Sequence, residues 1–212
     1  MKSTRICLVR HGETAWNAEK RIQGQTDIAL DTSGLAQAEA AARWLAQHDV
    51  AALYSSDLLR ARQTAMRIAA AVNLPLSLLP ALRERRYGFF EGLTYDEARA
   101  RHPEDYYAFE TRDPDYAFPD GGESLQQLHA RVTGQLRCLA ADHPGQTVVL
   151  VTHGGVLDIV NRFVRGTPLD SPRDFLIPNA GINWLSVRGE CWTLDAWGET
   201  GHLEAVGLDE LP

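Results

Sequence analysis

Lysine is nearly missing from this chain of 212 residues. Lys2 and Lys20 are the only lysines among 21 basic residues, so almost every positive charge is a guanidinium, which stays charged and can hold a phosphate through two hydrogen bonds. Acidic residues outnumber basic ones, and the formal net charge is -7. Nucleic acids and anionic membrane surfaces are bound by clustered positive charge, so we expect neither as a partner. Local arginines still allow a small anionic substrate.

Cysteines and long apolar runs are also scarce. Cys7, Cys138 and Cys191 stand far apart and lack C-x-x-C spacing, which predicts reduced packing residues rather than a metal site. The first apolar run, 6–9, is too short for a signal sequence or a membrane span and ends in charge. We therefore expect a cytoplasmic protein. With 44% hydrophobic residues, the chain can bury a sizeable core.

Predicted strands alternate along the chain with predicted helices of crossover length. This order is typical of a mostly parallel sheet that is covered by helices on both faces. In such sheets ligands bind beyond the carboxyl ends of the strands. Residues 55–57 offer side chains that could cap the second helix, and Ser124 with Gln127 forms a capping box. The predicted strands are 6–9, 51–54, 75–79 and 147–151, and the predicted helices are 33–45, 58–72, 124–142 and 154–164.

A hairpin signal stands near the C-terminus, where the tripeptide at 188–190 separates two β-type runs. It predicts two antiparallel strands, 182–187 and 191–197, at one edge of the sheet. An exposed edge strand would favour a homodimer, whereas a covered edge would not, and the sequence leaves both open. The hairpin carries three tryptophans, Trp184, Trp192 and Trp197.

An aromatic-rich stretch interrupts the alternation at about 84–122. Tyrosines and phenylalanines occur there among proline, aspartate and arginine, and we interpret the stretch as an insert with short helices. Aromatic residues at this density more often pack a small subdomain than line a ligand pocket. We therefore expect residues 1–212 to form a single domain with this insert.

Arg10 and His11 stand side by side where the first predicted strand meets a polar turn. The arginine disfavours protonation of the imidazole, and it can hold an anion that the histidine attacks. Parallel strands would bring Arg60, Glu84 and His153 to the same edge of the sheet. Two glycines follow His153, and they let backbone N–H groups at a helix N-terminus approach an anion closely.

This set of residues predicts phosphoryl transfer rather than metal chemistry. Arg10 and Arg60 would repel a divalent cation, and the sequence has no H-E-x-x-H or similar ligand spacing, so we expect no metal site. An uncharged His11 would attack phosphorus and form a covalent phosphohistidine.

The reaction also needs an acid for the leaving oxygen and then a base for water, and one carboxyl group can serve both steps. Glu84 is our candidate, although Glu13 and Glu91 also flank glycines near the predicted site. Neighbouring arginines would lower the pKa of Glu84, and a bound phosphate would raise it. We expect Glu84 to be protonated only in the substrate complex, provided that these arginines point away.

Five blocks occur in order along the chain: LVRHGET with WN and QG at 8–24, SSDLLRARQTA at 55–65, LRE at 82–84, GGES at 121–124 and VTHGG at 151–155. Together they resemble the histidine phosphatase superfamily, also called the phosphoglycerate mutase-like family. The resemblance implies a three-layer α/β/α sandwich with a mostly parallel sheet and antiparallel edge strands. It is strongest to the small phosphatase branch, which includes broad-specificity and α-ribazole phosphatase-like enzymes.

The resemblance also implies a role for each matching residue. His11 would be phosphorylated, and Glu84 would be the proton donor. No metal or organic cofactor is expected. The implied phosphate-binding groups are Arg10, Asn17, Arg60, His153 and the backbone N–H of Gly154, and the implied substrate contacts are Gln23 and Gly24.

The family contains both phosphatases and mutases. Cofactor-dependent mutases carry an insert rich in positive residues, including lysine, whereas residues 92–119 hold no lysine and only Arg99, Arg101 and Arg112. We therefore predict a phosphomonoester hydrolase for a small phosphorylated metabolite. A cofactor-dependent phosphoglycerate mutase is the alternative. A third hypothesis is an inactive protein that binds a phosphorylated ligand, but the presence of His11 and Glu84 argues against it.

Overall fold

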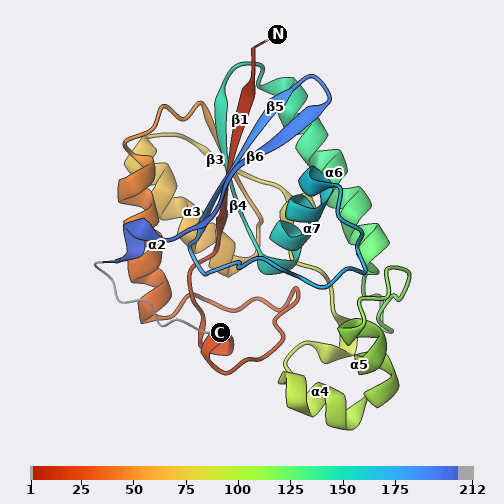
Figure 1. The fold of residues 1–212 in the computed structure, drawn as a ribbon. Helices are drawn as coiled ribbons and strands as arrows, with labels where there is room; N and C mark the ends of the chain where they lie inside the picture. The colour runs from red at the N-terminus through yellow and green to blue at the C-terminus, as the bar shows by residue number, and fades with distance from the viewer. Residues whose placement is uncertain (1, 205–212) are drawn as a thin grey trace.

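The structure is a computed structural model that describes residues 2–204. Within these residues six strands form one sheet in the order β3-β2-β4-β1-β5-β6 (Figure 1). Strands β1 to β4 run parallel, and β5 runs antiparallel to both β1 and β6. The predicted mostly parallel sheet is confirmed. The strands are β1 (Thr4–Arg10), β2 (Ala52–Ser55), β3 (Leu76–Leu78), β4 (Thr147–Thr152), β5 (Ile182–Arg188) and β6 (Cys191–Glu199).

Helices cover both faces of the sheet (Figure 1). Side chains alternate along a strand, so Cys7 and Val9 of β1 pack on one face and Ile6 and Leu8 on the other. The first pair joins the core under α2 (Thr32–Leu45) and α3 (Leu59–Val72). The second pair joins the core under α6 (Leu125–Asp142) and α7 (Gly154–Arg165). The chain thus has the three-layer sandwich that the family resemblance implied.

The insert lies beyond one end of the sheet, and its short helices occupy the lower part of Figure 1. Its aromatic rings pack on one another, as in the edge contact of Phe90 with Phe118 at 5.0 Å between centroids. Ile22 from the loop after β1 completes this cluster. The packing interpretation of the aromatics holds, whereas the single-domain assignment of 1–212 stays a prediction. The remaining elements are α1 (Ala15–Ala18), α4 (Tyr95–Arg101) and α5 (Pro103–Glu110), with 3₁₀ turns at Pro80–Leu82, Gly88–Phe90 and Gly201–Leu203.

The N-cap of α3 differs from the prediction that side chains at 55–57 would cap this helix. Leu58 is its N-cap and makes no side-chain cap hydrogen bond, and the N–H of Leu59 donates instead to Asp27 in the loop after β1. Ser56 accepts only a longer bond, of 3.3 Å, from the N–H of Leu58. The cap comes from a distant segment, and it ties the loop around Asp27 to the helix that carries Arg60.

The cysteines and the hairpin tryptophans are placed as follows. Cys7 is a buried core residue, but Cys138 and Cys191 are exposed, so the packing prediction is right only for Cys7. Cys138 lies on the outer side of α6, and Cys191 begins the edge strand. The ring of Trp192 contacts Phe163 of α7, and Trp184 is buried. A homodimer through this edge stays a prediction.

Across residues 2–204, the helices are each too short or too polar to span a lipid bilayer.

Candidate active site

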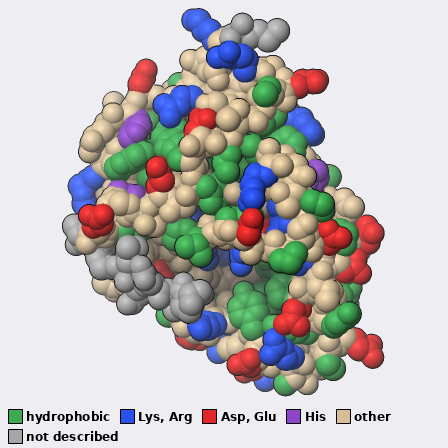
Figure 2. All heavy atoms as spheres, in the orientation of Figure 1, with side chains coloured by type: hydrophobic (Ala, Val, Ile, Leu, Met, Phe, Trp, Pro, Cys, Tyr) green, Lys and Arg blue, Asp and Glu red, His purple; other side chains and the backbone are tan. Residues whose placement is uncertain are grey.

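Polar residues that follow β1, β2 and β4 meet at the carboxyl end of the sheet, as the parallel order predicts. The rings of His11 and His153 lie 5.2 Å apart between centroids, and both are buried. Ser56, which follows β2, lies with its Oγ 2.7 Å from Nε2 of His153. Figure 2 shows a hollow between the sheet and the insert, with Lys or Arg side chains inside it. The two imidazoles therefore share one site, as the sequence predicted.

The loop that carries His11 is held in one orientation. Nδ1 of His11 lies 2.7 Å from the carbonyl oxygen of Gly12, which can only accept, so Nδ1 carries the proton and Nε2 keeps its lone pair. The N–H of Gly12 donates to Thr64, and Asn179 donates to the carbonyl oxygen of His11. Sequence reasoning missed the roles of Thr64 and Asn179. Thr64 stands inside the second sequence block, but Asn179 carries no sequence signal.

The surroundings of both histidines disfavour the charged imidazolium. Burial lowers the pKa of His11 well below its usual value, and the charges of Arg60 and Arg10 lower it further. Burial likewise lowers the pKa of His153, followed by the charge of Arg60. His11 is therefore a neutral ring at neutral pH, which is the form that a nucleophile needs.

We predict that neither ring titrates near 6.5, the ordinary histidine pKa. Because the pKa of each ring is lowered in the folded state, both rings bind protons only at pH values well below 6.5. Imidazole-selective NMR on the folded protein, with the urea-unfolded protein as the control, measures this directly. A His11 or His153 signal that moves with a midpoint near 6.5 in the folded protein would contradict the description of the site.

Arg10 and Arg60 are anchored by their terminal nitrogens. Nη1 of Arg10 donates to the carbonyl oxygen of Ile177 at 2.6 Å, and Arg60 donates to the carbonyls of Gly24 at 2.7 Å and Thr26 at 2.9 Å. Arg60 is 1% exposed. Burial lowers its pKa to about 10, which still leaves it charged at neutral pH.

Three buried nitrogens at the site have no hydrogen-bond partner among residues 2–204: Nε of Arg10, Nε of Arg60 and Nδ1 of His153. Buried donors are nearly always paired, because an unpaired one costs free energy. Nε2 of His153 and the Ser56 hydroxyl share a hydrogen bond in which either can donate, and we assign the tautomer in which the hydroxyl donates and Nδ1 carries the proton. An anion with several acceptor oxygens would satisfy all three nitrogens, which we call the unpaired donors.

The N-terminus of α7 faces the same point. A Cβ placed on Gly154 would lie 3.7 Å from Nε of Arg10 and 3.8 Å from Oε2 of Glu84. A Cβ on Gly155 would lie 2.2 Å from Oε1 of Glu84, so a side chain there would displace the carboxylate. The two glycines thus leave room beside the helix end for the Arg10 guanidinium and the Glu84 carboxylate.

Glu84 is fixed at both carboxylate oxygens. Its Oε2 accepts the N–H of Gly155 at 2.9 Å, and its Oε1 accepts the N–H of Arg85 at 2.7 Å. The side chain of Arg83 turns away to pair with Asp57, and that of Arg85 donates to the carbonyl of Glu123. Arg83 and Arg85 therefore point away from the Glu84 carboxylate, as its proposed role as an acid requires.

The alternative acids are engaged elsewhere. Glu91 accepts from the hydroxyl of Thr26 and from the backbone N–H of Tyr87, and it thereby holds the loop after β1 against the insert. Glu13 accepts from Gln37 of α2 at 3.4 Å. The charge of Glu84 acts on both Arg10 and Arg60, ahead of that of Glu13 on Arg10 and that of Glu91 on Arg60, so Glu84 stays the candidate.

The remaining predicted contacts lie on the loop between β1 and α2. Asn17 closes a capping box with Thr14, in which its Oδ1 accepts the N–H of Thr14, and phosphate contact by its amide nitrogen stays a prediction. Gly24 adopts a positive φ of 51° and gives its carbonyl to Arg60. Gln23 is buried, and its Oε1 has no partner within the described residues. Substrate contact by Gln23 and Gly24 stays a prediction.

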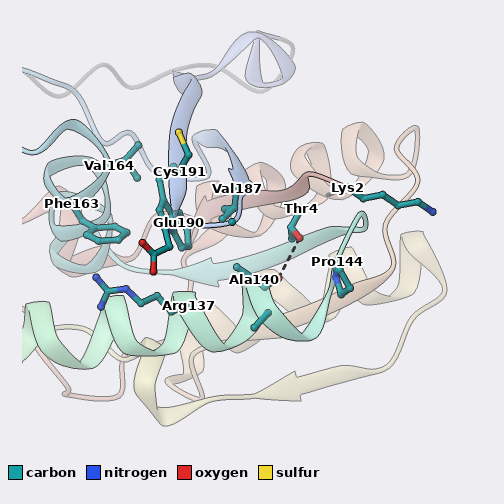
Figure 3. A pocket seen from close by; sticks show the side chains of 13 residues that line it. Lys2, Thr4, Arg137, Ala140, Pro144, Phe163, Val164, Val187, Glu190 and Cys191 are labelled. Atoms are coloured by element: carbon teal, nitrogen blue, oxygen red, sulfur yellow. Dashed lines mark hydrogen bonds between the residues drawn. The ribbon is translucent and has the colours of Figure 1, made fainter.

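A separate cavity of about 1250 Å³ lies between α6 and the β5–β6 hairpin, at the amino end of β1 (Figure 3). The residues that line it include Thr4, Arg137, Phe163 and Cys191 but none of the predicted site residues.

Across residues 2–204, no three His, Cys, Asp or Glu side chains gather as a metal site would require.

The chain is similar to known proteins in both sequence and structure. Residues 6–200 match the histidine phosphatase superfamily (branch 1). A metal-independent phosphoserine phosphatase of Arabidopsis thaliana is 42% identical over 207 residues, covering 97% of this chain and 85% of the relative. A "probable phosphoglycerate mutase" of Cronobacter sakazakii is 33% identical over 211 residues, covering 97% of this chain and 98% of the relative. The solved structure of YhfR from Bacillus stearothermophilus superposes with a TM-score of 0.87 at 32% identity, covering 95% of this chain and 100% of that one.

Proposed function

This chain belongs to the histidine phosphatase superfamily, and from that premise we propose that it hydrolyses phosphomonoesters of small metabolites through a phosphohistidine at His11. The observation that carries the proposal is the set of unpaired donors around a neutral His11. Such a site fits a phosphate group and disfavours a metal cation.

In the first step, the phosphate oxygens accept hydrogen bonds from Arg10, Arg60, His153 and the N–H of Gly154. The Nε2 lone pair of His11 attacks phosphorus, and the bond from phosphorus to the ester oxygen breaks. Glu84, protonated in the complex, gives its proton to that oxygen, and the alcohol leaves.

In the second step, the carboxylate of Glu84 takes a proton from water as the water oxygen attacks phosphorus. The bond from phosphorus to Nε2 breaks, and its electron pair returns to His11. Inorganic phosphate then leaves. The same donors stabilise the charge that builds on the phosphate oxygens in both steps.

The insert favours hydrolysis over isomerisation. Residues 92–119 of the insert hold no lysine, and each of the three arginines there pairs with a carboxylate: Arg99 with Glu110, Arg101 with Glu97, and Arg112 with Asp158. Only the Arg112 pair is shielded from water and firmly held, because the pairs of Arg99 and Arg101 are exposed. The mutase remains the second candidate, because a relative at 33% identity carries that name.

Incubation with 3-phosphoglycerate or phosphoserine tests the proposal, with released phosphate and isomerised product both measured. We expect phosphate release that is unchanged by a bisphosphoglycerate primer or by a chelator. Efficient primed isomerisation with little phosphate release would overturn the hydrolase in favour of the mutase. Tight phosphate binding without turnover would favour the phospholigand-binding protein. The cytoplasmic location stays a prediction, which cell fractionation can test.

A further inference from the structure

Arg131 of α6 lies behind the segment that carries Glu84. Its Nη1 donates to the carbonyl oxygens of Ala81 and Arg83, each at 2.9 Å. Its Nη2 makes a longer bond, of 3.4 Å, to the carbonyl of Glu84 itself. One guanidinium thus holds three carbonyls within four consecutive residues, which restrains the backbone of this segment.

The same guanidinium is fixed by a carboxylate on its other side. Nε and Nη2 of Arg131 donate to the two oxygens of Glu123 at 2.8 and 2.7 Å. The two side chains are 22% and 19% exposed, so the pair is partly shielded from water. A bidentate pair of this kind fixes direction as well as charge. Lysine could replace the charge of Arg131 but not its planar set of donors.

Glu123 also holds the segment just after Glu84. Its carbonyl accepts from Nε of Arg85 at 2.8 Å, and its N–H donates to the carbonyl of Arg86 at 2.8 Å. The GGES block at 121–124 therefore has two structural roles: Ser124 caps α6, and Glu123 bonds the segment after Glu84. Arg131 and Glu123 together hold the chain on both sides of Glu84.

We propose that Arg131, with Glu123, is a positioning residue for proton transfer: it fixes the backbone from which Glu84 reaches the leaving-group oxygen. This inference rests on the proposed phosphatase mechanism. Oε2 of Glu84 lies 2.9 Å from the N–H of Gly155, and Oε1 lies close against the same glycine. A backbone shift of about 1 Å would move the acid away from the ester oxygen, and misplacement of that size can cost on the order of 100-fold in rate.

The role predicts a dependence on the leaving group. Phosphoserine has an alkyl leaving group that needs a proton, whereas dinitrophenolate leaves without one. In single-turnover experiments we expect Arg131→Gln to slow phosphorylation of His11 by phosphoserine about 10- to 100-fold, and by dinitrophenyl phosphate less than about 3-fold. Glu84→Gln should show the same pattern. Both variants should accumulate phosphoenzyme, because Glu84 also activates water.

Two comparisons separate positioning from a general loss of structure. Arg137→Gln removes another arginine of α6, one that packs on Phe163 with its Cζ 5.1 Å from the ring centroid, and it should leave both rates unchanged. The double variant Glu84→Gln, Arg131→Gln should be no slower on phosphoserine than Glu84→Gln alone, because both changes remove the same proton transfer. Should Arg131→Gln fail to fold, Arg131→Lys and Glu123→Gln test the same point.

Equal losses on both esters, or additive losses in the double variant, would overturn the positioning role of Arg131. These outcomes differ from failure of the proposed function. If the wild-type protein forms no phosphoenzyme with either ester, the phosphatase mechanism fails. If it forms one and Arg131→Gln shows no leaving-group dependence, only the inference about Arg131 fails.

Discussion

Replacing His11 with alanine is expected to abolish turnover while leaving the fold intact. In the proposed mechanism the ring supplies the lone pair that attacks phosphorus, and its Nδ1 bonds the neighbouring carbonyl of Gly12. Loss of a nucleophile costs on the order of 10⁴-fold or more in kcat. Phosphate release measures the activity, and urea unfolding followed by circular dichroism measures the fold.

His129→Ala is the matched control, because His129 lies on α6 with its ring against Phe163, away from the unpaired donors. It should retain wild-type kcat. A His11→Ala protein that keeps most of its activity would show that another group attacks phosphorus, and the mechanism would then be wrong.

Replacing Arg60 with glutamine is expected to give the second large effect. The change removes a fixed charge from the proposed phosphate site and deprives the carbonyls of Gly24 and Thr26 of their donors. We expect kcat/KM to fall on the order of 1000-fold, the size seen when a key electrostatic donor is lost.

The pH profile gives this variant a second signature. Burial lowers the pKa of His11 most and the charge of Arg60 lowers it further, so removal of Arg60 should raise that pKa part of the way toward the ordinary value. His11 would then be protonated at a higher pH, and the residual activity should fall in mildly acidic buffer where wild-type activity persists. Arg62→Gln, an exposed neighbour on α3, is the control and should change neither quantity. A kcat/KM within a few-fold of wild type for Arg60→Gln would contradict the phosphate-binding role.

Local patterns and parallel topology explain what could be predicted from the sequence. The capping box of Ser124 and Gln127 involves residues three apart, so it can be read directly and is confirmed. His11 and His153 are far apart in sequence, but each follows a strand of a parallel sheet, and such strands end at the same edge. Their convergence could therefore be predicted from the sequence alone.

Contacts that depend on the direction of a side chain could not be predicted. Asp27 caps a helix that begins 32 residues later, and its own surroundings in the sequence give no sign of this. Asn179 reaches the carbonyl of His11 from a loop 168 residues away. Arg131 looks like an ordinary helix arginine until the carbonyls of the segment before Glu84 are placed around it. Each of these contacts arises only when loops and helices pack.

Trapping the phosphoenzyme tests the central claim most directly. Wild-type protein is mixed with phosphoserine or another hydrolysed ester, quenched in alkali within the first turnover, digested, and analysed by mass spectrometry. We predict one phosphoryl group on the imidazole of His11, stable in alkali and lost in acid, and none in His11→Ala. A phosphoryl group on a serine or a carboxylate, or turnover with no phosphorylated peptide, would contradict the phosphohistidine mechanism.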